Sequence, residues 1–106
     1  MKCYIQSHTL EVFLEAYKKK LEELKTVNFV IIDHISSASA LVFPVEKMVK
    51  ECKKRGITVL IDGAHAPGQL ELNLSRLGAD FYVGNLHKWC YAGTNFRVWW
   101  AKNLQL

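Results

Sequence analysis

Two uninterrupted apolar runs limit most strongly what this chain can fold into. The segment NFVIID covers residues 28–33, ITVLID covers residues 57–62, and both are rich in β-branched side chains. A strand with one face in water alternates apolar and polar residues, whereas a strand of a parallel sheet, covered on both faces, reads as a continuous apolar run. We therefore predict two buried, parallel strands, each of which ends at an aspartate.

Two helical patterns flank the first run. Residues 9–25 carry apolar side chains at helical spacing, with Glu and Lys on the other side, and Thr9 can cap the start of this helix. Pro44 suits the first turn of a second helix, which Gly56 closes. The inward face of this second helix is predicted to consist of Val45, Met48, Val49 and Cys52.

The same alternation continues after the second run. NLSRLGA (73–79) is predicted as a short helix or turn and DFYVG (80–84) as a third strand. FRVWWA (96–101) is compatible with a fourth strand, although its aromatic side chains could pack in several ways. Strands that alternate with helices predict an α/β fold, a layered sheet of mainly parallel strands with crossover helices.

Polar residues follow each predicted strand. Parallel strands bring their carboxyl ends to one edge of the sheet, which is where open α/β sheets bind ligands. The residues that we expect at this edge are Asp33, His34, Ser36 and Ser37 after the first strand, Asp62 and His65 after the second, and Asn85, His87 and Lys88 after the third.

Several of these residues have two interpretations. Asp62 is either a loop aspartate satisfied by nearby amides or a counter-ion for a bound cation. His65 alone is more often a loop or core histidine than a ligand. Lys88 is either a solvated surface lysine or, if shielded from water, an amine that can form a Schiff base with a carbonyl. Pyridoxal phosphate needs both a lysine for the Schiff base and an acid for its pyridinium nitrogen, so Asp62 and Lys88 together favour that cofactor.

Composition argues against several other classes of protein. The 106 residues are 50% hydrophobic, so the chain is at most one domain with a core. The net charge of +4 is concentrated in KKK (18–20) and KECKKR (50–55), which fit solvated helix faces better than a nucleic-acid site. The three cysteines fit neither a zinc site nor a disulfide framework. We expect a cytoplasmic protein with reduced thiols, because no segment resembles a signal peptide or is long enough to span a membrane.

The stretch from Asp33 to Trp89 resembles the large domain of class V aminotransferase-fold enzymes. The motifs that carry the likeness are DGAHAPGQ (62–69) and GADFYVGNLHKW (78–89) at this separation. The nearest group is the isopenicillin N epimerase-like proteins, with cysteine desulfurases as more distant relatives. The likeness covers residues 10–92 and implies that residues 1–106 are part of the cofactor-binding large domain of a fold-type I pyridoxal-phosphate-dependent transferase.

The resemblance also implies roles for individual residues. Lys88 would form the Schiff base with the cofactor and shuttle protons, and Asp62 would pair with the pyridine nitrogen. His65 stands where the family contacts the 3-hydroxyl oxygen, His87 and Asn85 where it holds the phosphate, and Ser37 near the substrate side of the ring. The implied substrate is a small amino acid molecule, and a homodimer is expected for the full-length family.

The chain departs from these relatives in two ways. Its segment 93–106, GTNFRVWWAKNLQL, replaces the usual Pro-Lys/Arg-Gly continuation and is treated as atypical. It is also several times shorter, so we expect apolar sheet faces to be left uncovered. A truncated, catalytically silent homologue is therefore one alternative. A metal-dependent hydrolase is a weaker one, and it would use Asp33, His34, Asp62, His65 and His87 as ligands.

Overall fold

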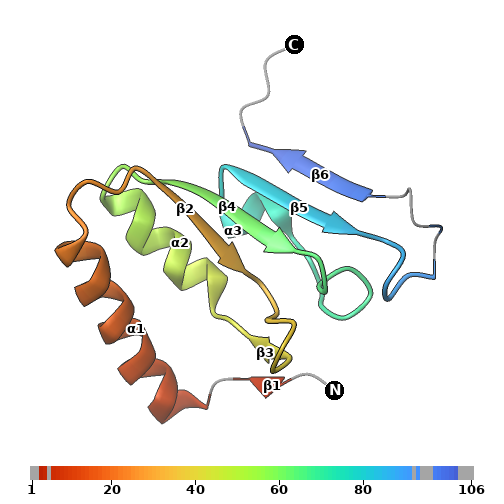
Figure 1. Ribbon diagram of the computed structural model, residues 1–106, viewed down its shortest axis with the longest axis horizontal. Helices are drawn as coiled ribbons and strands as arrows, with labels where there is room; N and C mark the ends of the chain where they lie inside the picture. Colours follow the sequence, from red (N-terminus) through yellow and green to blue (C-terminus); the bar gives the residue numbers. More distant parts are fainter. Residues whose placement is uncertain (1–2, 5, 92, 94–96, 103–106) are drawn as a thin grey trace.

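The computed structural model describes residues 3–4, 6–91, 93 and 97–102 (Figure 1). The elements in chain order are β1 Cys3–Tyr4, α1 Ser7–Glu23, β2 Phe29–Asp33, β3 Leu41–Val42, α2 Val45–Lys54, β4 Thr58–Gly63, α3 Leu74–Leu77, β5 Phe81–Asn85 and β6 Arg97–Ala101. The main sheet has the strand order β2-β4-β5-β6, and β1 pairs with β3 beside it.

The main sheet confirms the predicted α/β architecture. β2, β4 and β5 are parallel, and β6 runs antiparallel to β5. The segment 96–101, which was only compatible with a strand, thus contributes β6 at the edge of the sheet. The carboxyl ends of β2, β4 and β5 lie at the same edge, as Figure 1 shows from the direction of the three arrows. The short β1–β3 pair was not predicted, because two-residue strands carry no periodic signal.

The ends of the helices are only partly as predicted. α1 begins at Ser7, and Gln6 occupies its N-cap position without a side-chain hydrogen bond, so the prediction that Thr9 caps this helix is wrong. α2 begins directly after Pro44. Gly56 follows α2 with φ of +68°, a left-handed conformation that glycine adopts without strain.

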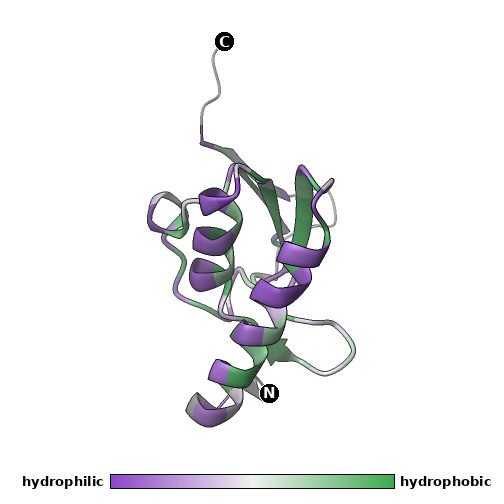
Figure 2. Ribbon diagram, turned by 90° about the vertical axis from the view of Figure 1, so that its left-hand side faces the viewer, coloured by the Kyte–Doolittle hydropathy of each residue, from purple (hydrophilic) through white to green (hydrophobic). Residues whose placement is uncertain are grey.

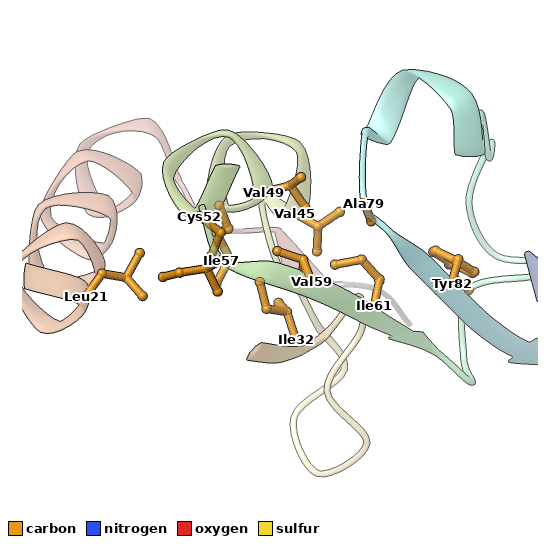
Figure 3. Packing of buried hydrophobic residues seen from close by; sticks show 12 residues of the cluster. Leu21, Ile32, Val45, Val49, Cys52, Ile57, Val59, Ile61, Ala79 and Tyr82 are labelled. Atoms are coloured by element: carbon orange, nitrogen blue, oxygen red, sulfur yellow. The ribbon is translucent and has the colours of Figure 1, made fainter. Parts of the chain in front are cut away.

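Both long helices pack on one face of the sheet. Figure 3 shows the resulting core, in which Val49 and Cys52 of α2 face Val59 and Ile61 of β4. α1 is tied to α2 through Tyr17, whose hydroxyl lies 2.9 Å from the Cys52 sulfur. The outer sides of the helices are hydrophilic and the strands hydrophobic, as the colours of Figure 2 show. None of the helices in the described ranges is both long and apolar enough to cross a membrane.

The opposite face of the sheet is open to solvent. Phe29 and Ile31 of β2 are 46% and 64% exposed, and Trp99 of β6 is 64% exposed. The paired positions Phe29–Thr58 and Ile31–Leu60 place these side chains on the same face as alternate residues of β4. The prediction that β2 is covered on both faces is therefore wrong for the described part of the chain, whereas the expected uncovered apolar face is present.

Candidate functional site

Three polar side chains share the open face at the carboxyl edge of the sheet. Asp33 pairs with Asp62, and Asp62 pairs in turn with Val83. Asn85 lies two residues beyond Val83 on β5 and so projects from the same face. The regular parallel register thus brings together carboxylates and an amide that are far apart in the sequence.

The carboxylate of Asp62 is positioned by its own loop. Its Oδ1 accepts a hydrogen bond of 3.0 Å from the backbone N–H of Ala64, and the residue is half-buried. No described residue bonds Oδ2, so that oxygen is available to a ligand. Because Asp33 lies directly across the parallel pair, two negative charges face the same space and favour a cationic group between or beside them.

The loops that follow β4 and β5 are in direct contact. Gly68 has φ of +83°, and a Cβ at this position would lie 2.8 Å from the Trp89 carbonyl oxygen and 3.1 Å from the Cys90 sulfur. Gly84 likewise lies against Gly63, since its Cβ would be 3.1 Å from the Gly63 carbonyl oxygen. Glycines at these points let the loop that carries His65 pack against the turn that carries Lys88.

A small cavity joins two more of the predicted residues. Ser37 and His65 line a space of about 160 Å³ together with Gln69 and Trp89. The neighbouring Ser36 has a different task, because its hydroxyl accepts a hydrogen bond from the Leu41 N–H and bonds the Ser39 hydroxyl. Ser36 therefore holds the loop before β3 in addition to lining the cavity that Ser37 and His65 share.

Asn85 and His87 contain buried polar atoms that lack partners. Asn85 Oδ1 and His87 Nδ1 are the two such side-chain atoms in the part of the chain that the structure describes. Buried polar atoms without hydrogen bonds are costly and point to a missing ligand or water. A phosphate fits this pair, because an imidazole N–H can donate to it and rotation of the Asn85 amide presents an NH2 donor. The residues present therefore fit the phosphate of pyridoxal phosphate.

Lys88 lies in the turn directly after β5, and its side chain is exposed. The sequence interpretation required a lysine shielded from water, and the described residues do not supply that shield. Lys88 nevertheless follows Asn85 and His87 closely and belongs to the turn that packs on the His65 loop. From this turn Lys88 could reach a ligand bound at the edge of the sheet, although the described residues around Lys88 leave its side chain in solvent.

His34 does not join the other predicted residues at this edge. It is 8% exposed, and its Nδ1 lies 2.9 Å from the hydroxyl of Tyr82, a fully buried residue on the face that the helices cover. The expectation that the His34 side chain gathers with Asp33 and Asp62 at this edge is therefore wrong. No group of three or more potential metal ligands occurs among the residues that the structure describes, so the metal-hydrolase alternative gains no support there.

Burial of His34 predicts a pH-dependent stability. Burial lowers the pKa of His34 from 6.5 to about 4, so between these values the unfolded chain binds a proton that the folded chain does not. Stability is therefore complete above pH 6.5 and is lost as the pH falls toward 4. We expect this residue alone to lower the free energy of unfolding by about 2 kcal/mol at pH 5 relative to pH 7.5, measured by urea unfolding.

The variant His34→Gln is the control for this prediction. The glutamine amide can still accept a hydrogen bond from Tyr82 but does not titrate. The difference in stability between pH 7.5 and pH 5 should shrink by the same amount in the variant. An equal pH dependence in both proteins would assign the effect to other groups.

Two contributors to the site were missed at the sequence level. Trp89 was given no part in the predicted site, yet it lines the cavity of Ser37 and His65 and contacts Gly68. Gln69 lines the same cavity. Their positions next to Lys88 and at the end of the DGAHAPGQ loop were the available signal, but no spacing rule connects two separate loops.

Comparison with known proteins finds relatives over most of the chain. Residues 5–103 match the family model described as aminotransferase class-V. The chain is 37% identical over 91 residues, 85% of its length, to an L-cysteine desulfhydrase from Arabidopsis thaliana. It is 49% identical over 61 residues, 58% of its length, to an isopenicillin N epimerase from Streptomyces clavuligerus.

Solved structures share the fold. A cysteine desulfurase from Thermococcus onnurineus NA1 superposes with a TM-score of 0.74 over 83% of this chain, at 30% sequence identity. The match covers 21% of that structure, and the two curated relatives are covered to 20% and 15% of their lengths. The chain thus spans about a fifth or less of the proteins that it matches.

Proposed function

The chain belongs to the aminotransferase class-V family, and from this membership we propose that it is the part of an enzyme that holds pyridoxal phosphate through Lys88 and acts on an amino acid. Enzymes of this family depend on pyridoxal phosphate. When bound, this cofactor supplies an electron sink for bonds at the α-carbon of an amino acid. The single observation that carries the proposal is the pair of partnerless buried atoms, Asn85 Oδ1 and His87 Nδ1, directly before Lys88.

Each residue of the edge has a task in this proposal. His87 and Asn85 donate hydrogen bonds to the phosphate, and Asp62 Oδ2 accepts one from the ring nitrogen and keeps it protonated. His65 contacts the ring hydroxyl, and Ser37 borders the substrate side. Lys88 Nζ would hold the cofactor at its aldehyde carbon, with loss of the aldehyde oxygen as water, and as a free amine it would accept and return a proton at the α-carbon of the amino acid.

The reaction type is left open between the activities of the relatives. One curated relative is named for the removal of sulfide from L-cysteine and the other for the epimerisation of isopenicillin N. Neither the described edge nor the family match distinguishes these reactions, because both begin with a lysine that carries the cofactor. We further propose that the longer proteins of this kind form homodimers, with the open apolar face of this sheet covered by other parts of the protein.

A catalytically silent chain is the second candidate. The exposed position of Lys88 and the open face of the sheet favour it for the 106-residue polypeptide by itself. The two candidates make different predictions about where the cofactor attaches.

Reductive trapping tests the proposed function. Purified protein is incubated with pyridoxal phosphate, reduced with borohydride and mapped by peptide mass spectrometry. We expect one dominant label on Lys88, which Lys88→Ala abolishes and the exposed control variant Lys102→Ala retains. Labels scattered evenly over surface lysines, or no label, would support the silent chain instead.

A further inference from the structure

A second, larger cavity lies on the face that the helices cover. It has a volume of about 650 Å³ and lies between the first turns of α2 and the segment 71–77; we call it the α2 pocket. His34, Phe43, Lys47, Lys50, Leu72 and Leu77 are the lining residues that matter for its chemistry. None of the residues assigned to the cofactor lines the α2 pocket.

The charges around the α2 pocket leave two lysines without partners. Glu46 and Arg76 form an ion pair of 3.5 Å across its rim. Lys47 and Lys50 lie three residues apart on α2 and therefore on one side of the helix. Neither lysine forms an ion pair with a residue that the structure describes. Of the two carboxylates that line the pocket, Glu71 also has no ion pair with a described residue. The unpaired lining charges thus carry a positive excess.

A buried histidine adds a directed donor to this pocket. Tyr82 is fully buried, and among the described residues its hydroxyl hydrogen has only His34 Nδ1 as an acceptor, at 2.9 Å. Tyr82 therefore donates to Nδ1, and the neutral ring of His34 carries its proton on Nε2. No described residue bonds Nε2. Because Nε2 is also not one of the fully buried atoms without a partner, it is accessible from outside the core. Because His34 lines the α2 pocket, this N–H is open to it.

We propose that the α2 pocket binds a small organic monocarboxylate. The carboxylate accepts hydrogen bonds from His34 Nε2 and is held by the charges of Lys47 and Lys50. The apolar part of the molecule packs on Phe43, Leu72 and Leu77, which a bare inorganic anion cannot use. Glu71 disfavours a second negative charge on the ligand. This proposal does not depend on the cofactor assigned to Lys88.

Hexanoate is the probe for this site, with hexanamide and inorganic phosphate as controls. Hexanamide has the same apolar part without the charge, and phosphate has charge without the apolar part. In NMR titrations we expect hexanoate to shift the His34 imidazole signals saturably and to leave those of the exposed His8 unchanged. Phosphate and hexanamide should bind at least tenfold more weakly. Absence of a saturable shift, or equal binding of hexanamide, would overturn the proposal.

A pair of charge-matched variants separates specific contacts from net charge. Lys47→Gln/Lys50→Gln removes the two lysines of the pocket, and Lys19→Gln/Lys25→Gln removes two exposed lysines elsewhere. We expect the Kd of hexanoate to rise roughly fivefold in the first variant, a size typical of two partly screened ion pairs, and to stay unchanged in the second. Equal Kd values for the first variant and the unmodified chain, or equal losses in both variants, would contradict the assignment of these lysines.

Discussion

Replacing Gly63 with alanine is expected to remove a large part of the stability of the fold. Gly63 is the last residue of β4, and a Cβ there would overlap the hydroxyl and ring of Tyr82 on β5. Tyr82 is fully buried and hydrogen-bonded to His34, so its ring has little room to move. We expect a loss of about 3 kcal/mol or more, the upper end for overpacking in a core, which is a large part of the stability of a small domain. Urea unfolding followed by circular dichroism measures it.

Two further variants identify the cause of this loss. Gly56→Ala meets no atom within 4 Å and should cost only the strain of its φ of +68°, about 1 kcal/mol. Gly63→Ala/Tyr82→Leu removes the ring that the new methyl group would overlap. The double variant should be more stable than Gly63→Ala alone. If Tyr82→Leu brings no recovery, the overlap is not the reason for the loss.

The second large effect concerns the cofactor. Asp62→Asn should weaken the binding of pyridoxal phosphate about ten- to hundredfold, because an amide cannot provide the charged acceptor that holds a proton on the ring nitrogen. The Ala64 N–H can still bond the amide oxygen, so the loop should keep its shape. The measurement is a titration of the cofactor by absorbance, with the stability of the variant recorded in parallel.

Asp33→Asn is the matched control for this variant. Asp33 pairs with Asp62 in the parallel register, so this substitution removes the same charge from the same face of the sheet. Unlike Asp62, Asp33 is exposed, because it lies on the edge strand β2. Its effect on cofactor binding should stay within about threefold, as for an exposed charge. Equal losses from both variants would show that the general negative charge of this edge matters, and that Asp62 has no special contact.

Much of the fold was predictable because its signals are local. The apolar run 28–33 contains β2, and the run 57–62 contains β4 except for its last residue, Gly63. The spacing of Val45, Met48, Val49 and Cys52 marks the buried side of α2. The position of Asp62 and Asn85 at one edge of the sheet, with Lys88 in the turn after β5, followed from parallel connections alone. Asn73 before α3 accepts a hydrogen bond from the Arg76 N–H, which agrees with the predicted short helix.

The features that were not predictable depend on contacts between distant residues. His34 directly follows Asp33, the last residue of β2, so the alternation of the strand directs it to the opposite, helix-covered face. The Tyr82 hydroxyl on another strand gives its ring a partner there. The exposure of Lys88 depends on what surrounds its turn, which no local pattern encodes. The continuous apolar pattern of β2 indicated burial on both faces, whereas the described residues cover only one.

The strict alternation along β4 has a consequence for how such a chain can change during evolution. Ile61 and Gly63 point to the helices, while Leu60 and Asp62 point to the open face. Loss or gain of one residue inside this strand would exchange the two sets and send the carboxylate into the hydrocarbon interior. Changes in the length of the chain are therefore confined to the turns at the two ends of β4.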